Sequence, residues 1–400
     1  MRAVFTPSTP GGSVAAPPSK SMAHRLLISA GLADGISRVS GVDTSEDVSA
    51  TLDCLSALGA KVDLNDGTAT VRGANPFRAK RATLPCRESG STLRFFLPLC
   101  LLSDGEKTLT GSETLLSRPL SVYEESAREK GFSLEKSQNA VRVAGKLTPG
   151  EYVLPGDVSS QFVSGLLFAL PLLDGDSRIV LIPPVESKSY IDLTLSALSS
   201  FGVTAIWTDE TTLTVPGRQR YAASEVEVEG DWSNAAPFLS LGVGVTGLRD
   251  DSLQGDRRIA DLLAKLDGEN AVIDLSDCPD LAPVLFAHAA LRRGGRFTGT
   301  RRLAIKESDR GEAMKAELAK CGVAVSVGEN EIVVGAGATS PSEPLFGHND
   351  HRIVMACSIL AARLGGTVAG IEAVKKSYPG FFADLRRINI KVDLENGMDL

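Results

Sequence analysis

The chain of 400 residues is 43% apolar, and single hydrophobic cores stop growing at roughly 250–300 residues, so we expect two domains. Its formal net charge of -7 and its isoelectric point near 5.4 exclude a general attraction to nucleic acid or to an acidic membrane surface. An anion would have to be bound by a local cluster of cations. Such a cluster suits a small acidic substrate better than a polyanion.

The six cysteines lie far apart in the sequence and show no paired spacing typical of a metal site or a redox motif. We expect all six to be buried, reduced thiols: Cys54, Cys86, Cys100, Cys278, Cys321 and Cys357. Residues 1–13 lack the apolar run of a signal peptide, and no later stretch reaches about 18 apolar residues without polar interruption. The sequence therefore predicts a soluble, cytoplasmic protein.

An apolar, helix-like segment that runs into an alternating, strand-like segment occurs six times along the chain. The copies, in chain order, are residues 21–41, 90–111, 159–182, 232–248, 280–300 and 348–371. A second pattern alternates strictly with the first: an amphipathic helix, a small residue, and then one or two strands. Its small residues are Gly59, Gly131, Gly202, Gly268, Gly322 and Asn389.

A glycine or asparagine directly after a helix favours a left-handed C-cap, which we expect at all six of these positions. Successive markers lie 54 to 72 residues apart, and the shortest interval follows Gly268. This short interval, through Leu266 to Cys278, indicates that a pair of strands has been trimmed there.

Six repeated units over two domains give three units per domain. We predict an α/β (α+β) fold in which each domain is a pseudo-threefold arrangement of mixed units, with central helices and outer strands, an inside-out α/β barrel. A single solenoid is the alternative. The chain is expected to cross between domains at Pro17-Pro18 and Gly230-Asp231. The domains would be residues 19–229, and residues 1–18 plus 230–400.

Five of the six apolar helices begin with polar clusters that core packing does not require: residues 18–25, 88–94, 157–162, 230–234 and 347–352. The sixth begins at residues 278–283. Free N–H groups and the helix dipole make a helix start suitable for binding an anion. Ordinary N-capping is the alternative for any one copy. Cations near these starts or in separate polar loops strengthen the anion hypothesis: Lys20, Arg25, Arg118, Lys306, Arg310, Arg352 and Lys376.

Several of these blocks, taken together and in this order, resemble the enolpyruvyl transferase family, and within it the 5-enolpyruvylshikimate-3-phosphate synthases. The resemblance runs from about Pro17 to Pro379. The blocks are Ser19-KSMAHR, Glu88-SGSTLRF, Asp157-VSSQF, Ser187-KSYID, Gly255-D, Pro279-D, Ile305-KESDR and Asn349-DHR. The resemblance implies two domains of three units each, with the substrates held in the cleft between them and with closure on binding.

The resemblance also implies a ligand set for each substrate. Shikimate 3-phosphate would be bound by Lys20, Ser21, Arg25, Ser159, Ser160, Gln161, Ser187, Asp280 and Lys306, with Tyr190 close by. Phosphoenolpyruvate would be bound by Lys20, Gly90, Arg118, Gln161, Arg310, Arg352 and Lys376. Guanidinium forks suit its phosphate and carboxylate, and Gly90 would leave room for it.

The implied reaction places a proton on the methylene carbon of phosphoenolpyruvate while the acceptor hydroxyl attacks the adjacent carbon, and phosphate then leaves. It needs acids and bases within hydrogen-bond reach, and no metal or cofactor. We assign Asp280 as the base toward the hydroxyl, and Glu307 with Lys20 to the proton at the methylene carbon. His351 would support the phosphate or Glu307. Alternatively, Asp280 is only an N-cap, and Glu307 only an ion-pair partner of Arg310.

Some positions depart from the family pattern. Glu88 stands where asparagine is common, and Arg302 stands where the family has an asparagine, so neither is assigned a role. Lys376 is chosen over Lys375 by its spacing to Pro379. His24 and His288 lie within apolar helices and are expected to be structural residues with satisfied hydrogen bonds.

Three other functions are possible for a chain with these features. The sister transferase that acts on UDP-N-acetylglucosamine typically has a loop cysteine near the Arg118 segment, and this chain has no cysteine between Cys100 and Cys278. A non-catalytic protein that binds anionic metabolites would not need Lys20, Asp280 and Glu307 together. An RNA-end cyclase would have a more basic face. We expect small-molecule substrates, no nucleic acid or membrane partner, and a monomer.

Overall fold

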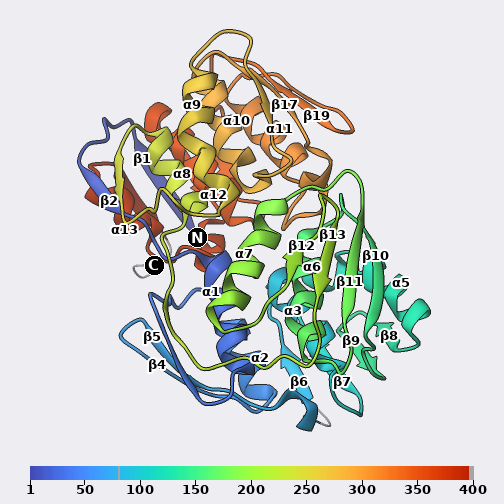
Figure 1. Cartoon of the computed structure of the whole chain (residues 1–400). Helices are drawn as coiled ribbons and strands as arrows, with labels where there is room; N and C mark the ends of the chain where they lie inside the picture. Colours follow the sequence, from blue (N-terminus) through green and yellow to red (C-terminus); the bar gives the residue numbers. More distant parts are fainter. Residues whose placement is uncertain (80–81, 396–400) are drawn as a thin grey trace. The chain divides into compact units, whose positions relative to one another are not determined.

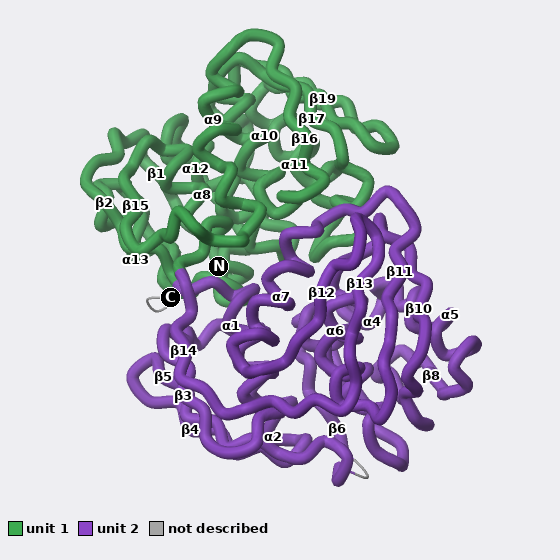
Figure 2. Tube along the Cα trace, viewed as in Figure 1, with its two compact units in different colours: residues 1–17, 230–400 green, residues 18–229 purple. Residues whose placement is uncertain are grey.

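The computed structural model describes residues 1–79 and 82–395. The chain divides into two compact units, which Figure 2 colours separately: unit 1 contains residues 1–17 and 230–400, and unit 2 contains residues 18–229. Pro18 therefore belongs to unit 2, one residue before the boundary expected from the sequence. Each unit buries its own hydrophobic core, one from Met22 to Val228 and the other from Ala3 to Val392.

Unit 2 contains three four-stranded sheets of the same design (Figure 1). In each sheet the first two strands are parallel and the other two join by antiparallel pairing. In spatial order the sheets are β14 (Glu225–Glu227), β3 (Ile36–Ser40), β5 (Thr68–Arg72), β4 (Lys61–Asn65); β6 (Ala82–Pro85), β7 (Lys107–Thr110), β9 (Ala140–Ala144), β8 (Ser133–Lys136); and β10 (Gly150–Pro155), β11 (Ser177–Ile182), β13 (Thr212–Val215), β12 (Ile206–Trp207).

The apolar helices of unit 2 are buried on nearly every face: α1 (Lys20–Leu32), α3 (Gly90–Cys100) and α6 (Ser160–Ala169). A Cβ on Gly165 would overlap the Tyr123 hydroxyl and the Arg94 carbonyl, so this glycine permits close packing of α6 on α3. The amphipathic helices are α2 (Glu46–Ala57), α5 (Ser121–Lys130) and α7 (Lys188–Ser200). The remaining short elements are η1 (Pro76–Arg78), α4 (Glu113–Ser117) and η2 (Leu170–Leu172).

Unit 1 repeats the design with two four-stranded sheets and one of two strands. The sheets are β16 (Val272–Asp274), β17 (Gly295–Thr298), β19 (Glu331–Val334), β18 (Val325–Val327); β20 (Leu345–Phe346), β21 (Gly366–Ala369), β1 (Arg2–Thr6), β22 (Lys391–Glu395); and β15 (Gly244–Thr246) with β2 (Ser13–Ala15). The short sheet belongs to the fourth repeat. Between α9 (Ile259–Leu266) and β16 the described chain forms no strand, which confirms the trimmed pair.

Apolar helices also lie centrally in unit 1, where they pack on one another: α8 (Trp232–Ser240), α10 (Ala282–Leu291) and α12 (His351–Leu364). The amphipathic helices of unit 1 are α9, α11 (Arg310–Lys320) and α13 (Phe381–Arg387). The short helices are η3 (Gly255–Arg258), η4 (Pro279–Leu281), η5 (Arg301–Ile305) and η6 (Ile371–Lys376). In the described ranges, no helix combines the length and hydropathy needed to span a bilayer.

The expected left-handed residues after the amphipathic helices are present at five of six markers, with φ between 67° and 104° at Gly59, Gly131, Gly202, Gly322 and Asn389. The expectation was wrong for Gly268. There α9 ends in right-handed residues at Asp267, and the left-handed position comes at Asn270, with φ 51°. The six cysteines are buried and unbridged, as expected.

Candidate active site

The polar clusters at the helix starts contain true N-caps. Side-chain oxygens of Ser19, Ser89 and Ser159 accept hydrogen bonds from first-turn N–H groups in unit 2, and Asp231 and Asp350 do so in unit 1. Ordinary capping therefore accounts for one residue in each cluster. The neighbouring polar residues are left for other roles.

Lys20 is the first residue of α1, and its ammonium pairs with Asp47 of α2 at 2.8 Å, from Nζ to Oδ2. Both side chains are nearly buried, with exposed fractions of 13% and 11%. Ser21 follows, and its carbonyl accepts from Arg25 Nη1 at 2.7 Å. The first turn of α1 thus presents a cation held in place by a carboxylate from a neighbouring helix.

Arg25 is almost completely buried, and its described hydrogen bonds run to uncharged groups. Its Nε donates to Thr194 Oγ1 at 2.8 Å, and its Nη2 donates to the Tyr190 carbonyl at 2.9 Å. Its guanidinium also lies 5.1 Å from the ring centroid of Phe95. Burial lowers the pKa of Arg25 to about 10, which still leaves the group charged at neutral pH. Arg25 therefore contributes positive potential beneath the helix starts.

Two guanidinium groups converge on Gly90, the first residue of α3. A Cβ at this position would lie 2.8 Å from Arg118 Nη1 and 3.1 Å from Arg94 Nη1, so an added methyl group would press on both. Arg94 Nη1 donates to Gln161 Oε1 at 2.7 Å, and Gln161 Nε2 donates to Ser91 Oγ at 2.9 Å. The starts of α3 and α6 and the Arg118 segment thus form one basic corner in unit 2.

Besides Ser21, the three other predicted serines lie at two further helix starts in this unit. Ser159 caps α6, Ser160 is its first residue, and Ser187 directly precedes α7. Ser187 has φ 55° and ψ 37°, a left-handed conformation that non-glycine residues adopt at some energetic cost. Such strain gathers at functional sites.

In unit 1, Arg310 joins three carboxylates at the start of α11. Its Nε donates to Asp350 Oδ2 at 2.9 Å, its Nη1 to Asp280 Oδ1 at 2.7 Å and its Nη2 to Glu307 Oε2 at 2.8 Å. Burial alone would lower the pKa of Arg310, but Asp350, Glu307 and Asp280 raise it well above its ordinary value. Arg310 therefore organises the acidic residues of this cluster and stays charged.

Asp280 accepts from Lys306 Nζ at 3.2 Å as well as from Arg310. Burial would raise the pKa of Asp280, but Lys306, Arg310 and Arg352 hold it well below its usual range. Burial also lowers the pKa of Lys306, and Asp280 opposes that shift. Asp280 makes ion pairs rather than capping α10, and Glu307 is indeed an ion-pair partner of Arg310.

The remaining predicted cations of unit 1 lie around the start of α12. Arg352 Nη1 donates to Asn234 Oδ1 at 2.8 Å, and the Nε of this buried side chain has no hydrogen-bond partner in the described chain. Lys376 Nζ donates to the backbone oxygen and to Oδ1 of Asn349, at 2.7 and 2.9 Å. His351 is buried, with Nδ1 3.9 Å from Asp350 Oδ1.

The two histidines expected to be structural differ in how well they are satisfied. His288 has partners on both ring nitrogens, Ser240 Oγ at 3.0 Å and Asp267 Oδ1 at 3.4 Å. His24 bonds to Thr51 Oγ1 at 2.7 Å through Nδ1, but its Nε2 has no partner in the described chain, so it is only half satisfied. Burial, Lys20 and Arg25 lower the pKa of His24, so it is neutral.

Three site residues were missed in the sequence: Asp47, Arg94 and Asp350. Arg94 and Asp350 fall within the blocks that carry the resemblance, and Asp350 occupies an N-cap position, which is a usable signal. Asp47 stands 27 residues from Lys20 in an ordinary acidic first turn. Arg302, left without a role, is buried and donates to the Ser276 carbonyl.

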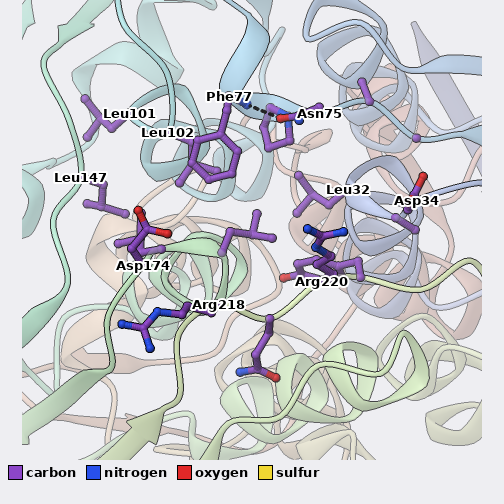
Figure 3. A pocket seen from close by; sticks show the side chains of 18 of the residues that line it. Leu32, Asp34, Asn75, Phe77, Leu101, Leu102, Leu147, Asp174, Arg218 and Arg220 are labelled. Atoms are coloured by element: carbon purple, nitrogen blue, oxygen red, sulfur yellow. Dashed lines mark hydrogen bonds between the residues drawn. The ribbon is translucent and has the colours of Figure 1, made fainter.

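A cavity of about 830 Å³ lies in unit 2 at the other end of the apolar helices (Figure 3). Phe77, Leu101 and Leu102 line one side of it, and Arg218 and Arg220 lie on the other. The cavity lies where α1 and α3 end, whereas Lys20 and Gly90 are at the starts of these helices. The two ends of a helix as long as α1 are about 18 Å apart. The cavity is therefore separate from the predicted site of this unit.

Comparison with known proteins gives a consistent family. The profile of the EPSP synthase (3-phosphoshikimate 1-carboxyvinyltransferase) family matches residues 6–272 and 265–385. A 3-phosphoshikimate 1-carboxyvinyltransferase of Clostridium kluyveri is 38% identical, with 97% of each chain covered. One from Clostridioides difficile is 36% identical, also with 97% of each chain covered.

The fold has a solved counterpart. An EPSP synthase structure from Acinetobacter baumannii superposes with a TM-score of 0.78, at 22% sequence identity, over 98% of this chain and 99% of that one. This agreement confirms the mixed α/β fold of repeated units that the sequence predicted.

Proposed function

We propose that this chain, which belongs to the EPSP synthase family, transfers the enolpyruvyl group of phosphoenolpyruvate to the 5-hydroxyl of shikimate 3-phosphate and releases phosphate. This is the sixth step of the shikimate pathway to chorismate and the aromatic amino acids. The observation that carries the proposal is the full-length similarity to enzymes named for this reaction, combined with the two charged clusters at the helix starts.

Unit 2 would supply most of the substrate binding. Lys20, Arg94 and Arg118 gather at the starts of α1 and α3, and the described bonds of Arg94 run to an amide oxygen and a carbonyl. A phosphate or carboxylate placed there can accept charge-assisted hydrogen bonds from these cations. Ser159, Ser160 and Ser187 would bind shikimate 3-phosphate from the adjacent helix starts, with Gln161 between the two substrates.

Unit 1 would supply the acid and base chemistry. Asp280 accepts the proton of the acceptor hydroxyl as the hydroxyl oxygen attacks C2 of phosphoenolpyruvate. At the same time Glu307, with Lys20, delivers a proton to C3. The tetrahedral intermediate then loses a proton from C3 and expels phosphate, which forms the enol ether. Each step is a proton transfer joined to an addition or an elimination, and the named side chains can perform them.

The ion pairs of Asp280 with Lys306 and Arg310 lower its strength as a base. With Lys306 and Arg310 beside it, Asp280 is ionised but weakly basic. Two bound substrates bring several negative charges, which compete for the same cations and raise the pKa of a nearby carboxyl. Substrate binding would thereby strengthen the base that the reaction requires.

The proposal requires that the groups of both units act on the same substrate pair, so it includes a closed state with both substrates bound between the units. Closure would exclude water from the reacting atoms. We also propose, from the sequence, that the protein works as a monomer in the cytoplasm.

A phosphate-release assay tests the function. The protein is incubated with phosphoenolpyruvate and either shikimate 3-phosphate or UDP-N-acetylglucosamine. Release with shikimate 3-phosphate alone supports the proposal, whereas release with the sugar nucleotide alone would replace it by the sister activity. Absence of release with either acceptor, together with binding of shikimate 3-phosphate, would indicate a non-catalytic binding protein.

A further inference from the structure

The turn that precedes α12 has an unusual backbone. His348 and Asn349 are consecutive non-glycine residues in the left-handed region, with φ values of 49° and 53°. Gly347 precedes them, and a Cβ there would collide with Val354 and lie 2.9 Å from the Gly370 carbonyl. A left-handed backbone is strained for a residue with a side chain, so neighbouring contacts must hold this turn in place.

Glu317 of α11 supplies such contacts on one side of the turn. Its Oε1 lies 2.7 Å from His348 Nε2, and its Oε2 accepts from the Phe346 N–H at 2.8 Å and from Lys320 Nζ at 2.8 Å. Only 2% of the Glu317 side chain is exposed. Burial would raise the pKa of Glu317, but the bonds from His348, Lys320 and Phe346 lower it, so the group is a buried carboxylate.

The other side of the same turn holds residues of the candidate active site. Asn349 accepts two hydrogen bonds from Lys376, and Asp350 caps α12 and accepts from Arg310. Arg310 and Glu317 are seven residues apart on α11, close to two full turns, so they lie on one face of that helix. Helix α11 therefore contacts the turn at two points. Glu317 bonds to Phe346 and His348, and Arg310 bonds to Asp350.

We propose that Glu317 and His348 are positioning residues for phosphoenolpyruvate binding. The bond between them holds the left-handed turn in the conformation that places the Asn349 oxygens against Lys376. The same turn sets the orientation of the Arg352 side chain in the first turn of α12. Neither residue touches the substrate. The inference rests on the proposed function, because Lys376 and Arg352 are its phosphoenolpyruvate ligands.

Two substitutions of His348 test whether its bond to Glu317 matters, because one side chain is too short to reach Glu317 and the other is long enough. His348→Asn keeps a side chain that tolerates left-handed backbone but is too short to reach Glu317. His348→Gln places an amide N–H about where the imidazole Nε2 lies. We expect the asparagine variant to raise the KM for phosphoenolpyruvate roughly tenfold, since small displacements of binding groups are costly. The KM for shikimate 3-phosphate should stay within about twofold, and the glutamine variant should recover most of the loss.

The chain offers a matched control for the carboxylate. Glu312 also bonds to a lysine three residues later on α11, Lys315, but both side chains are about half exposed. Glu317→Gln should raise the same KM, whereas Glu312→Gln should leave it unchanged. The double variant Glu317→Gln/His348→Asn should have a KM close to that of the more impaired single variant. Both substitutions act on the same interaction, between Glu317 and His348.

Specific outcomes would overturn the inference. It fails if His348→Asn lowers only the thermal midpoint and keeps the wild-type KM, or if the glutamine variant is as impaired as the asparagine variant. Wild-type turnover with shikimate 3-phosphate separates this failure from a failure of the proposed function. If the wild-type enzyme is active and the two KM values change in parallel, only the positioning role is wrong.

Discussion

Arg310 donates through Nε to Oδ2 of Asp350 at 2.9 Å, and this bond ties the first residue of α11 to the N-cap of α12. Both side chains are almost fully buried, with exposed fractions of 1% and 0%. The same guanidinium reaches Asp280 and Glu307, the two carboxylates to which we assign proton transfer. One arginine therefore fixes the geometry of the cap and of both proton-transfer groups.

Arg310→Lys should uncouple these roles. Lysine keeps the charge but lacks the planar fork, so it can reach at most one or two of the three carboxylates that Arg310 joins. Breaking a buried ion pair costs about 3–5 kcal/mol, and we expect a loss of stability near the lower end of that range because the charge remains. Urea unfolding measures the stability, and kcat/KM measures catalysis. Unchanged stability with unchanged kcat/KM would contradict the central role of Arg310.

Gly90→Ala should act on one substrate. The added Cβ would lie 2.8 Å from Arg118 Nη1 and 3.1 Å from Arg94 Nη1, so at least one guanidinium must move. We expect the KM for phosphoenolpyruvate to rise about tenfold with little change in the KM for shikimate 3-phosphate, because the displaced groups would bind the former. Steady-state kinetics with each substrate varied in turn distinguishes the two. An equal rise in both KM values would place Gly90 elsewhere in the mechanism.

Asp280→Asn and Glu307→Gln should each lower turnover. The pKa of Asp280 is held well below its usual range in the unliganded protein, so the kcat/KM of the wild-type enzyme, which reports the free enzyme, should not fall at mildly acidic pH through protonation of this base. Asp280→Asn removes that base at every pH, and its kcat should fall at least about a hundredfold across the whole profile. Glu307→Gln should lose kcat by removing the proton donor to C3. Full activity in either variant would remove that residue from the mechanism.

The sequence indicated the repeats because their signals are local. Apolar periodicity, small residues after helices and capping serines each depend on a few neighbouring residues, and Ser19, Ser89 and Asp350 cap the helices that such patterns indicate. The trimmed fourth repeat could be found from spacing alone. Gly268 was misjudged because two nearby residues, Gly268 and Asn270, can both adopt left-handed backbone.

The pairing of distant residues was not visible in the sequence. Lys20 meets Asp47, and Arg310 meets Asp350, 40 positions away, because separate helices bring them together. Strand pairing is another example, since the sequence indicated that residues 1–18 belong with residues 230–400 but not which strands pair. Strand β2 precedes α1 in the sequence but pairs with β15, while β14 precedes α8 but pairs with β3. Local patterns do not contain this information, since the partner is chosen by packing within each unit.

Asp256 is a buried carboxyl at the start of η3 and belongs to the Gly255-Asp block. Burial and the charge of Asp280 raise the pKa of Asp256 from 3.8 to about 7, and Arg352 only partly opposes them. The unfolded chain should titrate near the ordinary value, so the folded state binds an extra proton between these two pH values. Stability from this group is fully present below pH 4 and is lost as the pH rises through about 7.

Asp256→Asn removes the titration while keeping a side chain of similar size. The variant should therefore gain stability relative to wild type as the pH rises from 4 to 7, by at most about 1.4 kcal/mol per pH unit, and the difference should level off above pH 8. Urea unfolding of both proteins at several pH values measures this difference. Asp309→Asn would be a poor control because Asp309 caps α11, whereas Asp251→Asn removes an exposed carboxyl that pairs with Arg249 and should show no such rise. A stability difference that does not vary with pH would show that Asp256 is ionised throughout this range.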